Sequence, residues 1–135
     1  PALKPFIHWP GGKRQVLLKL RQKVPLTFNR YFEPFVGGGA LRLIYSQNAI
    51  INDVNKQLIN VYVQIKNNVE EVIKKVQEYD SVKCDNDYYL SMRDKYNKKI
   101  VNNELDVECA ALMLWINKHC FNALYRVNSK GLFNV

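Results

Sequence analysis

Three consecutive glycines that follow a short apolar run are the residues of this chain best suited to bind a ligand. Residues 30–36 predict a strand, and Gly37, Gly38 and Gly39 predict a turn that leads into a helix. Glycine lets the backbone approach a ligand closely, and a helix N-terminus presents unpaired N–H groups. Because ligands of open α/β sheets bind beyond the carboxyl ends of the strands, this turn predicts a ligand pocket.

The residues around the turn narrow the class of ligand. The turn lacks the Gly-Lys-Ser/Thr of a phosphate-binding loop, which argues against a nucleoside triphosphate. Arg42 stands where a dinucleotide-binding motif has its last glycine. A second apolar run, residues 49–52, predicts a second strand that ends at Asp53. An acid there can accept hydrogen bonds from both hydroxyls of a ribose. A ribose contact without a phosphate contact favours S-adenosylmethionine, and an ordinary glycine turn is the alternative.

A second segment, residues 6–13, places an aromatic residue, a glycine pair and a lysine ahead of a helical run. Lys13 can pair with a carboxylate of the cofactor. Trp9 can cover the adenine or line the pocket. The alternative for this segment is a capped turn with a tryptophan in the core.

The order and spacing of these segments resemble the DNA adenine-N6 methyltransferases of the GATC-methylating, Dam-like type (D12 class). The resemblance continues through residues 58–62 and 122–135 and spans nearly the whole chain. It implies that Trp9 and Lys13 contact the methionine part of the cofactor. It also implies that the glycine turn passes beneath the cofactor and that Asp53 binds the ribose.

Double-stranded DNA is the partner that the resemblance implies. An adenine within a duplex has to be flipped out before its amino group can be reached. Arg126 matches a position that resembles a guanine-reading arginine, and Phe121 matches a position where an aromatic ring can stack at the flipped site. For Phe121 and Leu124 the alternative is the core of a hairpin. The expected DNA-binding residues are Phe121, Asn122, Leu124, Arg126 and Lys130.

One departure from the family concerns catalysis. These enzymes use an Asp-Pro-Pro-Tyr loop, which resembles a clamp for the amino group of the flipped adenine, and the last proline of this chain is Pro34. We therefore assign no catalytic residue and expect the chain by itself to be inactive. We interpret it as the N-terminal part of an enzyme whose C-terminal half is a further partner. The alternative is a non-catalytic module that binds DNA or the cofactor; a methyltransferase acting on RNA or protein is disfavoured by the hairpin that carries Arg126.

Composition agrees with a polyanionic partner. The chain has 135 residues, a net charge of +8 and an isoelectric point near 9.5, and basic side chains gain affinity by releasing counterions from phosphates. The alternative is the bias of an A·T-rich genome, because lysine outnumbers arginine 14 to 6 and asparagine occurs 15 times. No signal-peptide pattern opens the chain, which favours the cytoplasm. Cys84, Cys109 and Cys120 predict reduced thiols, and we expect no metal site.

The predicted fold class is α/β. Residues 1–55 are expected to form the cofactor-binding part of a Rossmann-like sheet. Residues 56–135 are expected to form a mostly helical target-recognition region, incomplete at its C-terminus, because no glycine interrupts residues 40–130. Asp87 is expected to cap a helix, and Asn128–Gly131 to turn a β-hairpin. Helices are predicted near residues 13–23, 40–47, 58–65, 69–79, 87–96 and 110–116. The last of these is apolar nearly all round, so we expect it to be buried.

Overall fold

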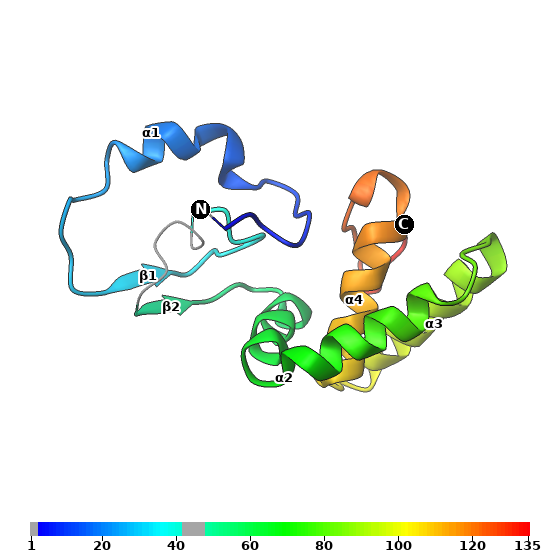
Figure 1. Cartoon of the computed structure of the whole chain (residues 1–135). Helices are drawn as coiled ribbons and strands as arrows, with labels where there is room; N and C mark the ends of the chain where they lie inside the picture. The colour runs from blue at the N-terminus through cyan, green and yellow to red at the C-terminus, as the bar shows by residue number, and fades with distance from the viewer. Residues whose placement is uncertain (1–2, 42–47) are drawn as a thin grey trace. The chain divides into compact units, whose positions relative to one another are not determined.

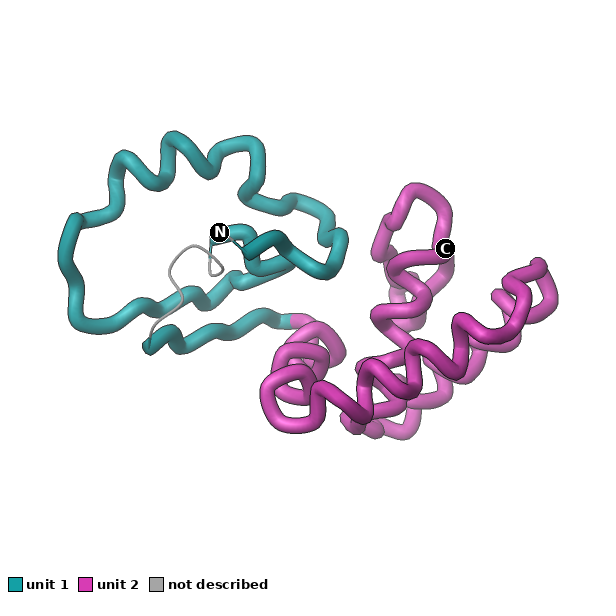
Figure 2. Tube along the Cα trace, in the orientation of Figure 1, with its two compact units in different colours: residues 1–54 teal, residues 55–135 magenta. Residues whose placement is uncertain are grey.

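The computed structural model of the chain describes residues 3–41 and 48–135. The chain divides into two compact units, Pro1–Val54 and Asn55–Val135 (Figure 2). The first combines short helical turns with two strands, and the second is built from helices (Figure 1). No helix within the described residues is long and apolar enough to cross a membrane.

The helix predicted over residues 13–23 is confirmed in place but differs in form. It begins as a 3-10 turn, Lys13–Val16, and continues as the short helix α1, Leu17–Arg21. Its end is tightened by a bond from the N–H of Lys23 to the carbonyl of Leu20, 2.9 Å, ahead of a proline that disfavours helical backbone in the residue before it. Most of the helix predicted over residues 40–47 lies outside the described residues.

Two parallel strands form the sheet of the first unit. β1, Tyr31–Glu33, and β2, Ala49–Ile51, pair in register from the first residue of each to the last. The pairing continues beyond the strands, because Asn52 donates its N–H to the carbonyl of Glu33 (2.8 Å) and accepts from the N–H of Val36 (2.9 Å). The glycine turn after β1 and the residue after β2 therefore come to the same edge of the sheet.

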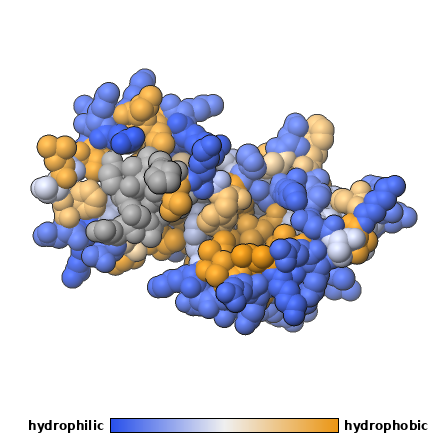
Figure 3. All heavy atoms as spheres, viewed as in Figure 1, coloured by the Kyte–Doolittle hydropathy of each residue, from blue (hydrophilic) through white to orange (hydrophobic). Residues whose placement is uncertain are grey.

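The sheet leaves apolar side chains exposed. Phe32 and Ile50, opposite each other in the two strands, are both more than half exposed. Figure 3 shows apolar atoms among the hydrophilic ones on the surface in view. Sheets usually have more than two strands. The described residues thus show a mixed structure with a small parallel sheet, which is part of what the predicted α/β class requires.

Helix α2, Lys56–Asp80, joins two segments that the sequence predicts as separate helices. Asn55 caps it by accepting a hydrogen bond from the N–H of Leu58, 2.8 Å. The backbone leaves helical geometry at Asn68, where φ is −141° and ψ is 41°. Neither proline nor glycine follows, so the helix resumes after one irregular residue and the expected break is only a kink.

Helix α3, Asn86–Val101, begins two residues earlier than the predicted cap implies. Asp85 is the cap, because its carboxylate accepts the N–H of Tyr88 at 2.8 Å. The prediction that Asp87 caps this helix is wrong. Asp87 lies in the first turn, where its negative charge still favours the helix N-terminus.

Helix α4, Val107–His119, is the centre of the second unit and packs mainly against α2 and also against α3. Its predicted burial is confirmed, since a helix that is apolar nearly all round has to be covered on all sides. Trp115 is fully buried, and the ring of Tyr88 meets it edge-on at 5.5 Å. Burial raises the pKa of the Cys109 thiol to about 12, which keeps this side chain neutral.

The C-terminal segment, residues 121–135, forms less of a hairpin than the sequence predicts. A 3-10 turn, Phe121–Ala123, is followed by one antiparallel bridge between Val127 and Phe133. The turn between them is built by Asn128, whose side-chain oxygen accepts the N–H groups of Lys130 (2.9 Å) and Leu132 (3.1 Å). Because this side chain binds the backbone of the turn, the described residues contain a turn and a bridge here but no pair of strands.

Candidate functional site

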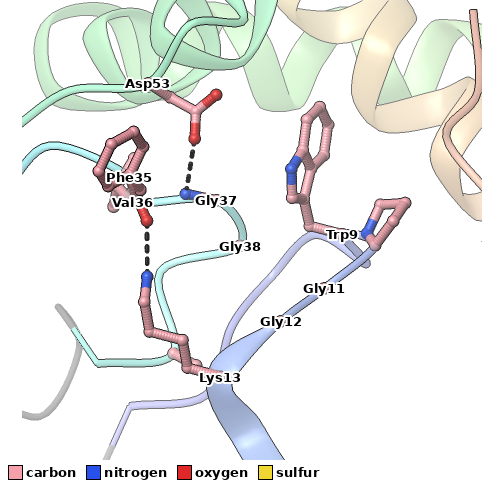
Figure 4. A pocket seen from close by; sticks show the side chains of 11 residues that line it. Trp9, Gly11, Gly12, Lys13, Phe35, Val36, Gly37, Gly38 and Asp53 are labelled. Atoms are coloured by element: carbon pink, nitrogen blue, oxygen red, sulfur yellow. Dashed lines mark hydrogen bonds between the residues drawn. The ribbon is translucent and has the colours of Figure 1, made fainter.

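The glycine turn and Asp53 are joined by a hydrogen bond. The N–H of Gly37 donates to Oδ2 of Asp53 at 3.0 Å (Figure 4). The parallel pairing of β1 and β2 makes this contact possible, because both residues lie just beyond the carboxyl ends of neighbouring strands. A carboxylate has about four acceptor positions, so the bond from Gly37 by itself does not exhaust Asp53.

Trp9 packs against the same turn. A Cβ atom at Gly37 would lie 3.2 Å from Cδ1 of Trp9, and a Cβ atom at Gly38 would lie 3.3 Å from Cβ of Trp9 and 3.2 Å from the carbonyl oxygen of Ile7. Gly37 also has a φ of +51°, and Gly39 has a φ of +77°, conformations that other residues adopt at a cost. Close packing at Gly37 and Gly38, and a positive φ at Gly37 and Gly39, therefore favour glycine at all three positions of this turn.

A cavity of about 250 Å³ opens between these elements (Figure 4). It is slightly smaller than the roughly 300–1,000 Å³ that is typical of ligand pockets. Five of the six cofactor-binding residues predicted from the sequence line it; Gly39 does not. Its lining includes Trp9, Lys13, Gly37, Gly38 and Asp53.

Lys13 is held by two oxygens, one from the last residue of β1 and one from the loop that follows it. Its ammonium group donates to Oε1 of Glu33 at 3.1 Å and to the carbonyl oxygen of Phe35 at 2.6 Å. Glu33 is only 5% exposed, and its other oxygen accepts from the hydroxyl of Tyr31 at 2.9 Å. An ammonium group has three N–H donors, and these two bonds use two of them. The sequence predicted Lys13 as a cofactor-binding residue but did not predict that Glu33 pairs with it.

The residues around the cavity suit a small zwitterionic ligand with hydroxyl groups. Asp53 supplies a carboxylate that can accept hydrogen bonds, Lys13 supplies an N–H donor, and Trp9 supplies an aromatic surface. The negative charge of Glu33 compensates the positive charge of Lys13 at 3.1 Å. Lys13 therefore acts as a directed donor more than as an isolated cation. This donor set fits S-adenosylmethionine.

The five predicted DNA-binding residues lie on the C-terminal segment of the other unit, and all five are exposed. Phe121 is 75% exposed, and Leu124 is also exposed, so neither is the hairpin core that was the alternative. Asn122 has a left-handed backbone with a φ of +53°. The side chains of Arg126 and Lys130 are exposed as well.

Helix α3 anchors this segment from beneath. The side-chain amide of Asn97 bonds both backbone groups of Phe133: its Oδ1 accepts the N–H and its Nδ2 donates to the carbonyl, each at 2.9 Å. Tyr89 donates its hydroxyl to the carbonyl of Val135 at 2.8 Å. These contacts span 36 to 46 residues of sequence, and no local pattern indicates them.

A buried aromatic cluster completes the anchor. The hydroxyls of Tyr96 and Tyr125 lie 2.7 Å apart, and the rings of Tyr125 and Phe133 lie 5.3 Å apart. Burial raises the pKa of both tyrosines, so the pair stays neutral at neutral pH. The exposed residues of the segment are thus carried on a firmly packed base.

Two basic residues that precede the C-terminal segment, Lys118 and His119, contact Asp80 at the end of α2. Lys118 donates to Asp80 at 3.1 Å, and Nε2 of His119 lies 3.2 Å from the other oxygen of Asp80. Partial burial favours a higher pKa for Asp80, but the hydrogen bonds from these two side chains outweigh it and lower that pKa. This group ties the end of α4 to the end of α2.

Comparison with known proteins gives the same family as the sequence motifs. Residues 9–135 match the family described as D12 class N6 adenine-specific DNA methyltransferase. The chain is 42% identical over 134 residues to a Type II methyltransferase, M1.LlaDCHI, of Lactococcus lactis subsp. cremoris, an alignment that covers 98% of this chain and 47% of the relative. It is 34% identical over 140 residues to a DNA adenine methylase of Haemophilus influenzae, covering 100% of this chain and 48% of the relative.

A DNA adenine methylase of Escherichia coli is 31% identical over 133 residues, covering 96% of this chain and 46% of that protein. The chain spans about half the length of these curated relatives. The resemblance predicted from the glycine turn, the acid after the second strand and the C-terminal segment is confirmed.

Proposed function

The chain belongs to the D12 class of N6 adenine-specific DNA methyltransferases, and from this premise we propose that it carries the cofactor-binding and DNA-binding parts of such an enzyme. The reaction is the transfer of a methyl group from S-adenosylmethionine to N6 of an adenine in a short site such as GATC. Residues 1–55 contribute the cofactor-binding part of a Rossmann-like domain, and residues 56–135 contribute the target-recognition region.

One observation carries the proposal. The glycine turn and Asp53 meet at the carboxyl edge of a parallel sheet, beside a cavity that Lys13 and Trp9 also line. Ligands of open α/β sheets bind at this edge. Residues with complementary chemistry from three separate segments of the chain are thus brought to one cavity.

Each residue has a distinct role in this proposal. Asp53 accepts the ribose hydroxyls while its bond to Gly37 holds the glycine turn in place. Lys13, oriented by Glu33 and the carbonyl of Phe35, directs a donor toward the carboxylate of the methionine part. Trp9 covers one side of the ligand. When bound, the cofactor supplies the electrophilic methyl group, and the protein supplies orientation.

The C-terminal segment is proposed to bind the target DNA. Arg126 reads a guanine, because its forked donors match O6 and N7 in the major groove. Phe121, with most of its ring exposed, stacks where the adenine leaves the helix. Lys130 contacts the phosphate backbone, and Asn122 and Leu124 lie beside the same site. A non-catalytic module that binds DNA or the cofactor remains the second candidate, since the 135 residues contain no Asp-Pro-Pro-Tyr.

Calorimetric titration of S-adenosylmethionine into the chain and its Asp53 variants tests the proposal. Asp53→Asn keeps an oxygen for the N–H of Gly37 but removes the charge, whereas Asp53→Ala removes both. A hydrogen bond to a charged group is worth about 1.5–3 kcal/mol, so we expect the Asn variant to bind roughly 10- to 150-fold more weakly. Asp94→Asn, a substitution at an exposed acid of α3, is the matched control and should leave the affinity unchanged.

Two results would contradict the assignment. If Asp53→Asn binds as tightly as the parent chain, Asp53 serves only to hold the turn. If the parent chain shows no binding at cofactor concentrations in the millimolar range, this cavity is not a cofactor site in this chain, and the second candidate is left with DNA as its ligand.

A further inference from the structure

Arg126 is linked to Asn134 through both side chain and backbone. Nε of Arg126 donates to Oδ1 of Asn134 at 3.0 Å. The N–H of Asn134 donates to the carbonyl oxygen of Arg126 at 3.2 Å. The two residues flank the bridge between Val127 and Phe133, so the backbone bond sets their spacing and the side-chain bond sets the direction of the guanidinium.

Asn134 bonds Nε of Arg126, and the contact with guanine can be made by the two terminal nitrogens instead. A guanidinium group has five N–H donors in one plane, one on Nε and four on the two terminal nitrogens. The terminal pair can form the fork that matches O6 and N7 of guanine. A bond at Nε within this plane restricts the rotation of the group, and it does not use the four N–H groups of the terminal nitrogens of this exposed residue.

Asn134 is a suitable support because its neighbours are fixed to α3. Phe133 is 2% exposed, and both of its backbone groups bond to Asn97 at 2.9 Å. On the other side, the carbonyl of Val135 accepts from Tyr89 at 2.8 Å and from Arg93 at 3.2 Å. Asn134 thus lies between two anchored residues and transmits the rigidity of the helix to an exposed arginine.

We propose that Asn134 is a positioning residue that fixes the guanidinium plane of Arg126 for reading guanine. The inference rests on the proposed function, in which Arg126 contacts a guanine. An exposed arginine has many rotamers, and ordering it at the moment of binding costs conformational entropy. A guanidinium group that is already oriented loses less conformational entropy when it contacts guanine. Only a duplex that has the guanine benefits, so the orientation raises the preference for that duplex.

The experiment measures the affinity of the whole chain for two duplexes at one fixed salt concentration, because a basic chain binds any duplex at low ionic strength. One duplex carries GATC, and in the other the first G·C pair of this site is changed to A·T. The variants are Asn134→Ala, Asn134→Asp, Arg126→Ala and Lys130→Ala. Asn134→Asp keeps an acceptor for Nε and is the conservative rescue, and Lys130→Ala is the control for a phosphate contact.

A bidentate arginine–guanine contact corresponds to a preference of roughly 5- to 150-fold for the first duplex. Arg126→Ala should abolish this preference, and Asn134→Ala should reduce it by about 2- to 10-fold, the value of one hydrogen bond. Asn134→Asp should lower both affinities, because it adds a negative charge near DNA, yet keep their ratio. Lys130→Ala should lower both affinities and also keep the ratio.

A second measurement follows the Nε–H resonance of Arg126 in the free chain. We expect slowed exchange of this proton in the parent and in Asn134→Asp, and fast exchange in Asn134→Ala. This result tests positioning without DNA, and a merely structural role of Asn134 would not produce it.

The outcomes separate the inference from the proposal on which it rests. If Arg126→Ala loses the preference but Asn134→Ala keeps it, the inference is wrong and the proposed function stands. If both Asn134 variants lose the preference equally, or if Asn134→Ala weakens both duplexes alike, Asn134 contacts DNA itself and the inference is again wrong. If the parent shows no preference, or Arg126→Ala keeps it, base reading by Arg126 and the inference are both refuted.

Discussion

Replacing Gly37 by alanine should destabilise the first unit more than the same replacement at Gly11. Both glycines have a left-handed backbone, with φ of +51° at Gly37 and +72° at Gly11. They differ in their surroundings. A Cβ atom at Gly37 would lie 3.2 Å from Cδ1 of Trp9, whereas a Cβ atom at Gly11 would have no heavy atom within 4 Å.

The magnitudes follow from these two terms. A left-handed conformation costs a residue with a Cβ atom about 1–2 kcal/mol. The lower entropy of alanine in the unfolded chain offsets roughly 0.4–1 kcal/mol of this, so Gly11→Ala should cost about 1 kcal/mol. Gly37→Ala adds the displacement of Trp9, and crowding of this kind costs typically about 1–3 kcal/mol. We therefore expect a total of about 2–4 kcal/mol for Gly37→Ala.

Urea unfolding followed by the indole N–H resonances provides the assay. The chain has two tryptophans, Trp9 in the first unit and Trp115 in the second, so each unit has its own reporter. The midpoint of the Trp9 transition should fall further in Gly37→Ala than in Gly11→Ala. Equal shifts for the two variants would refute the close packing of Trp9 on the glycine turn.

Two more predictions concern activity and pH. The 135-residue chain should transfer no labelled methyl groups from S-adenosylmethionine to a GATC duplex, because it lacks the Asp-Pro-Pro-Tyr clamp; clear turnover by this chain would disprove that expectation. The second concerns the pKa of Asp106. Burial favours a higher pKa for this carboxyl group, but hydrogen bonds from Lys99 and from the N–H of Cys109 outweigh burial and hold the pKa below its ordinary value of 3.8. Its stabilising charge is complete above that value and is lost as the pH falls through the lower pKa of the folded state. Asp106→Asn, which keeps an oxygen to cap α4, should therefore lose less stability than the parent in urea titrations taken from about pH 5 to about pH 2; identical acid slopes would show that the pairing with Lys99 contributes nothing.

The sequence alone indicated the features that depend on neighbouring residues. Residues 30–36 and 49–52 were predicted as strands because they are short apolar runs, and β1 and β2 lie within them. The stretch without glycine was predicted to be helical, and α4 was expected to be buried because its apolar residues face every direction. The family too was accessible, because its motifs are short and follow each other in order.

Local patterns failed where two similar signals competed. Asp85 and Asp87 are both acceptable caps, and only the backbone geometry at Asp85 decides between them. The expected hairpin became a single bridge because the side chain of Asn128 binds the backbone of its turn. At Asn68, a helix that lacks proline and glycine kinks and continues.

Partners far apart in the chain were decided by the tertiary structure. The bond between Gly37 and Asp53 exists because two parallel strands end side by side, and Glu33 meets Lys13 across 20 residues. Asn97 and Phe133 are 36 residues apart. Sequence periodicity reports which face of an element is apolar, but it carries no information on which element will cover that face. The residues suited to chemistry were therefore determined by the sequence, and the partners that orient them by the fold.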